Sequence, residues 1–400
     1  MRRIDPTRFK IARQGTSRQI NRQIALTLIS SHQPLSRADL ARRMSLRRGA
    51  IGLLVDELLR HGQLVEAPAT STARGRRPTL LSINTQQRSS VAVDVRASGT
   101  FVMLADAIGR PRSRVQRAPT PRDPKRFVAR LARRIRALLK TSDAGPCQGV
   151  GVVVPGMVDH VTGRVLHAPT LGWQNVDIRE PLARAIGLPV HIENSGRACA
   201  LAQSWQARNL AAPVGDLVYV SVSDGVGVGV MINGELVRGR HNIAGEFAHM
   251  PLSLDGPRCS CGAQGCWEAY ISNLATLSRY GDRKSVHGRK RPSSIVDLIA
   301  RARDGDARAT AALRTTARYL GLGLSAITNT VNPGTIYIGG EITTAWDLIG
   351  ATVRSAMKER ALIPAAAATS LVTVSAGDLP RLRGAAMLVA APVFAAPVVA

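Results

Sequence analysis

The stretch "RCSCGAQGCWE" (Arg258–Glu268) contains three of the five cysteines in this 400-residue chain. Such a cluster is typical of a disulfide knot, a DNA-binding zinc finger, a catalytic metal site or a structural clamp. Five cysteines are an odd number, and they are too few for a disulfide scaffold. Three thiolates need a fourth ligand to complete the tetrahedron of a structural zinc site. We therefore predict a zinc site here, with its fourth ligand supplied by another part of the chain.

The sequence on both sides of this cluster, from about residue 91 onward, alternates between strand and helix patterns. Apolar runs such as "VAVDVR" (Val91–Arg96) and "GVGVVV" (Gly149–Val154) predict buried strands, whereas "PKRFVARLARRIRALLK" (Pro124–Lys140) predicts an amphipathic helix. Alternation of this kind indicates an α/β protein with layered sheets. Because the cysteines lie deep inside this region, a structural clamp is a better interpretation than a zinc finger that reads DNA.

The composition limits the class of protein further. With 45% hydrophobic residues, the chain can bury a sizeable core. No apolar run reaches the roughly 18 residues that a membrane span needs. The basic N-terminus is not followed by the apolar segment of a secretion signal. We therefore expect a cytoplasmic protein without a membrane partner.

The formal net charge of +27 is concentrated near the N-terminus. Residues 1–90 hold 17 Lys and Arg against 5 Asp and Glu, a net charge of +12, whereas residues 91–400 hold 37 against 22, a net charge of +15. A basic segment of this kind favours a polyanionic partner, most simply DNA. The alternative is a general preference for arginine, since only six residues are lysine. Charge alone therefore leaves DNA binding open.

The local pattern of the basic segment predicts helix, turn and helix. Ser36 is a favourable N-cap for a short helix in "SRADLARRM" (Ser36–Met44), and a third helix runs to about His61, before the helix stop at Gly62. This arrangement sets its second helix into the major groove of DNA.

A β-hairpin wing is expected next, because the extended runs "QLVEA" (Gln63–Ala67) and "TLLSIN" (Thr79–Asn84) flank an arginine-containing loop. Arginines in such a loop can lie along phosphates or in a narrow minor groove. The alternative is a plain helical bundle with a solvated basic loop. The residues expected to contact DNA are Ser36, Arg37, Arg47, Arg48, Ala50, Arg74, Arg76 and Arg77.

The segments "PLSRADLARR" and "GRRP" resemble the winged helix-turn-helix of bacterial repressors of the ROK (repressor, open reading frame, kinase) family. Later, "VPGMVD", "ENSGRACALA", "DGVGVGV", "AGEFAHM", "CSCGAQGCWE" and "NPGTIYIGGEI" follow in the order found in ROK sugar kinases and repressors. The chain is similar to the branch of xylose and N-acetylglucosamine repressors. This resemblance implies an α/β fold: a winged helix-turn-helix followed by a two-lobed, actin-like (ribonuclease H-like) domain.

The same resemblance implies the domain limits. We expect the DNA-binding domain in residues 1–67, the wing and linker in 68–90, and the first lobe in 91–190, completed by a C-terminal helix in 381–400. The second lobe is expected in residues 191–380 and contains the zinc site.

Site residues follow from the resemblance as well. Its implied zinc ligands are His249, Cys259, Cys261 and Cys266; with all four positions filled by protein, the metal is structural. The implied effector-binding residues are Asn194, Ser195, Glu246, His249 and Glu268. Their carboxylates and amide suit the hydroxyl groups of a sugar.

Two departures from the kinases of the family concern catalysis. Ser195 stands where kinases have the aspartate that serves as general base, and serine has no usable pKa for that task. The phosphate loop D-x-G-G-T-K of the kinases is replaced by "DVRASGTF" (Asp94–Phe101), which keeps Asp94 only as a relic or a structural residue. We therefore expect no sugar kinase activity.

The sequence is thus interpreted as a DNA-binding transcriptional regulator of carbohydrate metabolism, a repressor controlled by a sugar or sugar derivative. A homodimer or homotetramer bound to a double-stranded operator is expected. Two alternatives stay open: a sugar kinase with an added DNA-binding domain, and a repressor that no longer binds sugar. Thr170 and Ala248, which replace residues common in the family, leave the identity of the sugar open.

Overall fold

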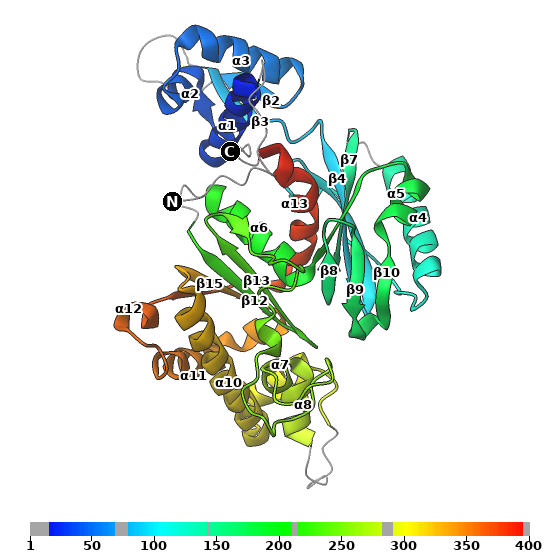
Figure 1. Cartoon of the computed structure of the whole chain (residues 1–400), viewed down its shortest axis with the longest axis vertical. Coiled ribbons are helices and arrows are strands. Elements are labelled where there is room, and N and C mark those ends of the chain that lie inside the picture. Colours follow the sequence, from blue (N-terminus) through cyan, green and yellow to red (C-terminus); the bar gives the residue numbers. More distant parts are fainter. Residues whose placement is uncertain (1–15, 69–78, 142–144, 210–214, 282–290, 395–400) are drawn as a thin grey trace.

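The computed structural model describes residues 16–68, 79–141, 145–209, 215–281 and 291–394. These residues form a small N-terminal unit and two larger α/β lobes, with the last helix lying between them (Figure 1). Among the described helices, none is both long enough and apolar enough to cross a membrane.

The N-terminal unit contains three helices and a three-stranded antiparallel sheet. Its helices are α1 (Thr16–His32), α2 (Arg37–Met44) and α3 (Arg48–Arg60), and its sheet has the order β1 (Leu35–Ser36), β3 (Thr79–Ile83), β2 (Leu64–Pro68). Ser36 and Asp39 form a complete capping box that starts α2, and Ser45 ends it in the left-handed conformation. The predicted helix-turn-helix and hairpin strands are confirmed. The loop between β2 and β3, with Arg74, Arg76 and Arg77, lies outside the described residues.

The two lobes share one strand order. The first sheet is β11 (Val190–Asn194), β7 (Cys147–Val154), β4 (Ser89–Arg96), β5 (Gly99–Asp106), β6 (Gln116–Ala118). The second is β16 (Ser370–Thr373), β15 (Thr335–Gly339), β12 (Leu217–Val222), β13 (Val226–Ile232), β14 (Glu235–Leu236). In each, the first strand along the chain is central, with an antiparallel neighbour on one side and a parallel neighbour on the other. This repeated sheet is the expected actin-like, ribonuclease H-like arrangement.

The remaining elements cover these sheets. The first lobe carries α4 (Pro124–Lys140), α5 (Arg179–Ile186), the short helix η1 (Pro169–Leu171) and a small sheet of β8 (Met157–Asp159), β9 (Arg164–Ala168) and β10 (Trp173–Asp177). The second lobe carries α7 (Glu268–Ile271), α8 (Asn273–Gly281), α9 (Ile295–Arg303), α10 (Ala307–Val331), α11 (Trp346–Lys358), α12 (Pro364–Ala367) and the short helices η2 (Phe247–His249), η3 (Glu341–Ala345) and η4 (Ala376–Asp378).

The first sheet extends further along the chain than the limit of residue 190 expected for its lobe. Strand β11 pairs in parallel with β7 from Val190 to Asn194, so the sheet ends at Asn194, at the opening between the lobes. Helix α13 (Pro380–Phe394) returns to this sheet and packs against β4 and β7. Its approach requires glycine at position 151, where a Cβ atom would lie 1.8 Å from the carbonyl oxygen of Ala385.

Helix α6 (Ser195–Asn209) links all three units. It begins directly after β11, packs against α13 and against β12 and β13 of the second lobe, and also contacts α1 (Figure 1). Leu26 and Ile29 of α1 belong to one buried hydrophobic cluster with Trp205 of α6 and Met387 of α13. The N-terminal unit therefore rests on α6 and α13.

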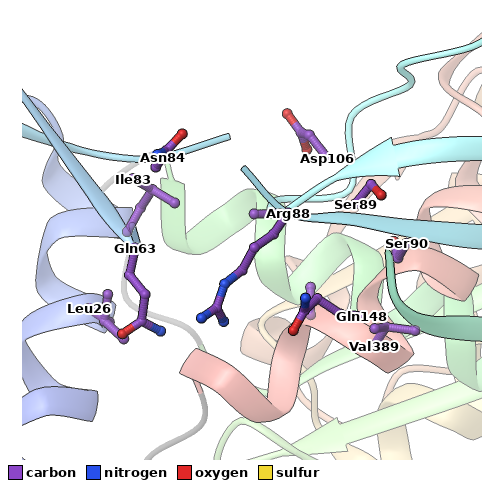
Figure 2. A pocket seen from close by; sticks show the side chains of 12 residues that line it. Leu26, Gln63, Ile83, Asn84, Arg88, Ser89, Ser90, Asp106, Gln148 and Val389 are labelled. Atoms are coloured by element: carbon purple, nitrogen blue, oxygen red, sulfur yellow. The ribbon is translucent and has the colours of Figure 1, made fainter. Parts of the chain in front are cut away.

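A small cavity marks the joint between the N-terminal unit and the first lobe. Its volume is about 40 Å³, and Leu26, Gln63 and Ile83 face Gln148 and Val389 across it, with Arg88 projecting between the two sides (Figure 2). Burial, together with the charge of Arg22, lowers the pKa of the Arg88 guanidinium. The cavity has room for a few water molecules but not for a sugar.

Candidate metal centre and binding cleft

A cleft of about 210 Å³ lies where the two lobes meet, at the end of β11 and beside the glycine-rich turn between β12 and β13. Residues of both lobes line it, among them Arg96, Gly156 and Ser223. All five residues predicted to bind an effector also line this cleft: Asn194, Ser195, Glu246, His249 and Glu268. The structure thus brings together residues spread over more than 70 positions of the sequence.

The four predicted metal ligands form a compact cluster beside the cleft. The ligand atoms of His249, Cys259, Cys261 and Cys266 all lie within 4.8 Å of one another. The Sγ atoms of Cys261 and Cys266 are 3.7 Å apart, and the Cys259 Sγ atom is 3.6 Å from the His249 Nδ1 atom. A tetrahedral zinc site with Zn–S bonds of about 2.3 Å places its sulfur atoms roughly 3.8 Å apart. Three thiols and one imidazole with this spacing therefore fit zinc.

The protonation state of Cys259 also bears on metal binding. Burial raises the pKa of the Cys259 thiol to about 12. A zinc ion bound here would polarise and deprotonate this thiol, as coordination does in structural sites. Since all four positions of the tetrahedron are occupied by side chains, the metal would hold the loop rather than activate water.

Glu268 joins the metal loop to the cleft. Its Oε1 atom accepts a hydrogen bond of 2.7 Å from the Ser260 hydroxyl, beside Cys259, and its Oε2 atom accepts one of 2.8 Å from the backbone N–H of Val226. The carboxylate is therefore fixed between the cysteine loop and the glycine-rich turn. The hydrogen bond from Ser260 therefore links the metal loop to this residue.

Both polar atoms of the Asn194 side chain form hydrogen bonds within the protein. Its Oδ1 atom accepts hydrogen bonds from the backbone N–H groups of Gly196 (2.8 Å) and Arg197 (3.2 Å), and its Nδ2 atom donates to the Gly156 carbonyl at 2.7 Å. The side chain thus caps the start of α6 and fixes the turn after β7. Ser195, the first residue of α6, lines the cleft.

Arg197, which was not among the predicted site residues, is 1% exposed. Its guanidinium lies 3.6 Å from Glu193 and 3.7 Å from Glu246, and it donates a 2.6 Å hydrogen bond to the Asn242 carbonyl. Burial raises the pKa of Glu246, and the charge of Arg197 opposes that effect. One signal was present in the sequence: Arg197 is the only charged residue in "SGRACALA" (Ser195–Ala202), an otherwise small-residue helical stretch.

A second missed group surrounds Asp94, which is fully buried. The Arg96 Nε atom lies 2.7 Å from one oxygen of Asp94, and the Arg381 Nε atom lies 3.0 Å from the other. Asp94 therefore has a structural role: it holds two arginines at the edge of the cleft. Arg381 had no signal in the local sequence, since it comes from α13, far along the chain.

The residues expected to contact DNA fall into two groups. The Ser36 hydroxyl is engaged in the capping box, and Arg37 forms ion pairs of 2.8 Å with both Asp56 and Glu66. These contacts hold the N-terminal unit together. In contrast, Arg47, Arg48 and Ala50 are exposed at the start of α3, and neither arginine has a carboxylate partner among the described residues. The start of α3 therefore presents two arginines to solvent.

Comparison with known proteins shows where the chain belongs. A model of the ROK family matches residues 90–391. The xylose repressor of Bacillus subtilis (strain 168) is 30% identical over 353 residues, which cover 88% of this chain and 89% of that protein. The DNA-binding transcriptional dual regulator NagC of Escherichia coli (strain K12) is 25% identical over 363 residues, 86% of each chain.

A solved structure supports the same assignment over nearly the whole length. The crystal structure of a ROK family transcriptional regulator, a homolog of the E. coli MLC protein, matches with a TM-score of 0.80 and 26% identity. The match covers 94% of this chain and 97% of that one, so it includes the N-terminal unit as well as both lobes. The chain belongs to the ROK family.

Proposed function

We propose that this protein is a transcriptional repressor that binds an operator through its N-terminal unit and releases it when a sugar or sugar derivative binds in the cleft. One observation carries the proposal. The same chain presents an exposed helix start with Arg47 and Arg48, and a cleft lined by Glu246, His249 and Glu268. The relatives named above, which are regulators of this architecture, support it.

DNA binding would use the geometry of a helix-turn-helix. The start of α3 enters the major groove, where Arg47 and Arg48 can reach guanine or phosphate and Ala50 can contact a thymine methyl group. Two copies of the chain, as a homodimer or within a homotetramer, would read half-sites spaced by about one turn of DNA.

Effector binding would use the cleft. The ionised carboxylates of Glu246 and Glu268 accept hydrogen bonds from sugar hydroxyl groups, and one ring nitrogen of His249 can face the sugar while the other binds the metal. Bound zinc would supply a fixed anchor for the loop of Cys259–Cys266. The residue assignments in the cleft and on α3 are part of this proposal.

Gel-shift titration with upstream fragments of carbohydrate genes tests the proposal. We expect a sequence-specific complex at physiological salt that a monosaccharide or its derivative dissociates. The double variant Arg47→Ala, Arg48→Ala is expected to lower operator affinity at least about tenfold and to reduce the slope of log K against log salt by about 2. Arg126→Ala, which removes an exposed arginine of α4, is the matched control. Binding without sequence preference would contradict the proposal.

We further infer that the protein does not phosphorylate sugars. Ser195 cannot act as a general base, and Asp94 is occupied by Arg96 and Arg381. A coupled assay with ATP and a panel of sugars is therefore expected to show no turnover. A rate above about 1 per second, typical of a working enzyme, would support a kinase instead.

A further inference from the structure

A second cavity, of about 500 Å³, lies along α6 beyond the cleft. It is bounded by residues 202–206 of α6, by Arg383 and Met387 of α13, by the turn after β5, and by β15 and the edge strand β16; we call it the α6–α13 pocket. The two helices pack against each other between the lobes (Figure 1). Among the described residues, none lines both this pocket and the cleft, which lies about two turns of α6 away. The volume is within the range of small-molecule sites.

Three polar side chains of the α6–α13 pocket have no hydrogen-bond partner within the part of the chain that the structure describes. They are Gln203, which is 5% exposed, and Tyr337 and Arg383, which are half-buried. Side chains buried to this extent normally have partners, so a ligand in the pocket would supply what these three lack. Burial also raises the pKa of the Tyr337 phenol, so its hydroxyl stays protonated at neutral pH. An amide, a phenol and a guanidinium can all donate hydrogen bonds to a carboxylate.

The charged side chains of the pocket have both signs. Arg110 and Asp378 are exposed, whereas Arg383 is half-buried. Asp106 lies close to Arg110: burial raises the pKa of Asp106, and the charge of Arg110 opposes that effect. With Arg110 offset by Asp106, the pocket presents one cation, Arg383, and one anion, Asp378. A ligand that satisfies both therefore carries a negative and a positive group.

Much of the remaining lining is apolar. Ile108, Val374 and Met387 come from three different elements, and each is less than 10% exposed. Val372, on the edge strand, adds a fourth apolar side chain. A ligand that covers this surface gains free energy in proportion to the apolar area removed from water. The pocket is therefore suited to a small zwitterion that also has an apolar part.

The α6–α13 pocket also adjoins the surface on which the N-terminal unit rests. Trp205 and Met387 line the pocket, and both belong to the buried cluster that contains Leu26 and Ile29 of α1. Interiors of proteins are close-packed, so a ligand held against these two side chains changes the packing beneath α1.

We propose that the α6–α13 pocket is a second ligand site, separate from the cleft, for an amino acid with an apolar side chain. The carboxylate of the ligand accepts hydrogen bonds from Gln203, Tyr337 and Arg383, and its ammonium group faces Asp378. Its side chain lies against the apolar lining near Met387. Occupancy of the site changes operator affinity through α1; this last part rests on the proposed function, whereas binding of the amino acid does not.

Calorimetric titration of the full chain tests the site. The probes are leucine and phenylalanine, their amides, the deaminated acids isocaproate and phenylpropanoate, and glycine. We expect leucine or phenylalanine to bind at least about tenfold more tightly than its amide, which lacks the carboxylate, and than its deaminated acid, which lacks the ammonium group. Glycine, which has no apolar side chain, should bind at least about tenfold more weakly than either.

Two charge variants assign the groups. Arg383→Gln should weaken binding of the amino acid and of its deaminated acid at least about tenfold, and should not weaken binding of the amide. Asp378→Asn should weaken binding of the amino acid and of the amide, and should leave the deaminated acid unaffected. Arg314→Gln and Asp304→Asn, at exposed positions outside the pocket, are the matched controls and should change none of these affinities.

A third variant blocks the space itself. Thr373→Trp, at an exposed position of β16 that lines the pocket, fills it without disturbing a buried side chain and should abolish amino-acid binding. Glu246→Gln, in the cleft, should leave amino-acid affinity unchanged. Melting temperatures close to that of the unmodified protein show that each variant is folded.

Three outcomes would overturn the site. They are that neither amino acid binds, that binding survives both Arg383→Gln and Asp378→Asn, and that Glu246→Gln alters the affinity, which would place the amino acid in the cleft.

A gel shift with the operator then tests the link to α1. The amino acid should change operator affinity at least about fivefold in the unmodified protein and should have no effect in Thr373→Trp. An unchanged operator affinity with the site occupied would refute the link and leave the ligand site standing. If the chain binds no operator at all, the proposed function fails, and the calorimetric result still decides the site.

Discussion

Replacing Cys259 with serine is expected to abolish the effector response at protein concentrations where operator binding is still intact. The change removes one of four metal ligands, and a structural zinc site that loses a thiolate loses most of its metal affinity. The loop then no longer fixes Glu268 and His249, each of which would contribute a charge-assisted hydrogen bond. We expect effector affinity to fall about 100-fold, measured by calorimetry beside zinc content by mass spectrometry.

The matched control is Cys147→Ser, in the first lobe and outside the metal cluster. This variant should keep both zinc and effector affinity. A Cys259→Ser protein that loses operator binding but keeps its effector affinity would show that the metal serves the DNA-binding unit instead. Removal of zinc from the unmodified protein by a chelator should reproduce the effect of Cys259→Ser.

Glu246→Gln is expected to lower effector affinity about 10- to 100-fold, because a neutral amide replaces an ionised acceptor of sugar hydroxyls. The pKa of Glu246 is raised by burial, so in the unmodified protein affinity should fall as the pH drops through this raised pKa. In the variant, that loss on acidification should disappear. Calorimetry between pH 4.5 and 7.5 measures both effects.

The melting temperature distinguishes a loss of effector affinity in Glu246→Gln from unfolding of the variant. A carboxyl group whose pKa is higher in the folded than in the unfolded protein favours folding when protonated, and this contribution is lost as the pH rises through the folded-state pKa. At neutral pH the variant should therefore unfold at the same or a slightly higher temperature. Glu235→Gln, at an exposed position of strand β14, is the control and should change neither affinity nor melting temperature. An unfolding temperature well below that of the unmodified protein would contradict this account of Glu246.

Features encoded by local spacing could be predicted from the sequence. The helix start at Ser36 and the cysteine cluster each depend on residues within about ten positions, and the structure contains both. Contacts between residues separated by long stretches of chain were harder to predict. Their meeting depends on how whole elements pack, which local periodicity does not encode.

Arg381 and Arg37 illustrate what could not be predicted. Arg381 meets Asp94 only because α13 returns across β4 and β7, nearly 290 residues later. Arg37, which is expected to contact DNA, forms ion pairs with Asp56 and Glu66 that no local sequence pattern encodes. The limit of the first lobe was set too early for a similar reason, since only the pairing of β11 with β7 shows which sheet those residues join.

Helix α6 has its first residue in the cleft and its later turns against α1. Its 15 residues make a rod about 22 Å long, since an α-helix rises about 1.5 Å per residue. A tilt of about 10° around the cleft end would displace the far end by about 4 Å, close to the spacing of successive base pairs along DNA. Under the proposed function, the rod would serve as a lever: a small tilt at Ser195 would displace α1, and with it the N-terminal unit, by about the spacing of one base pair.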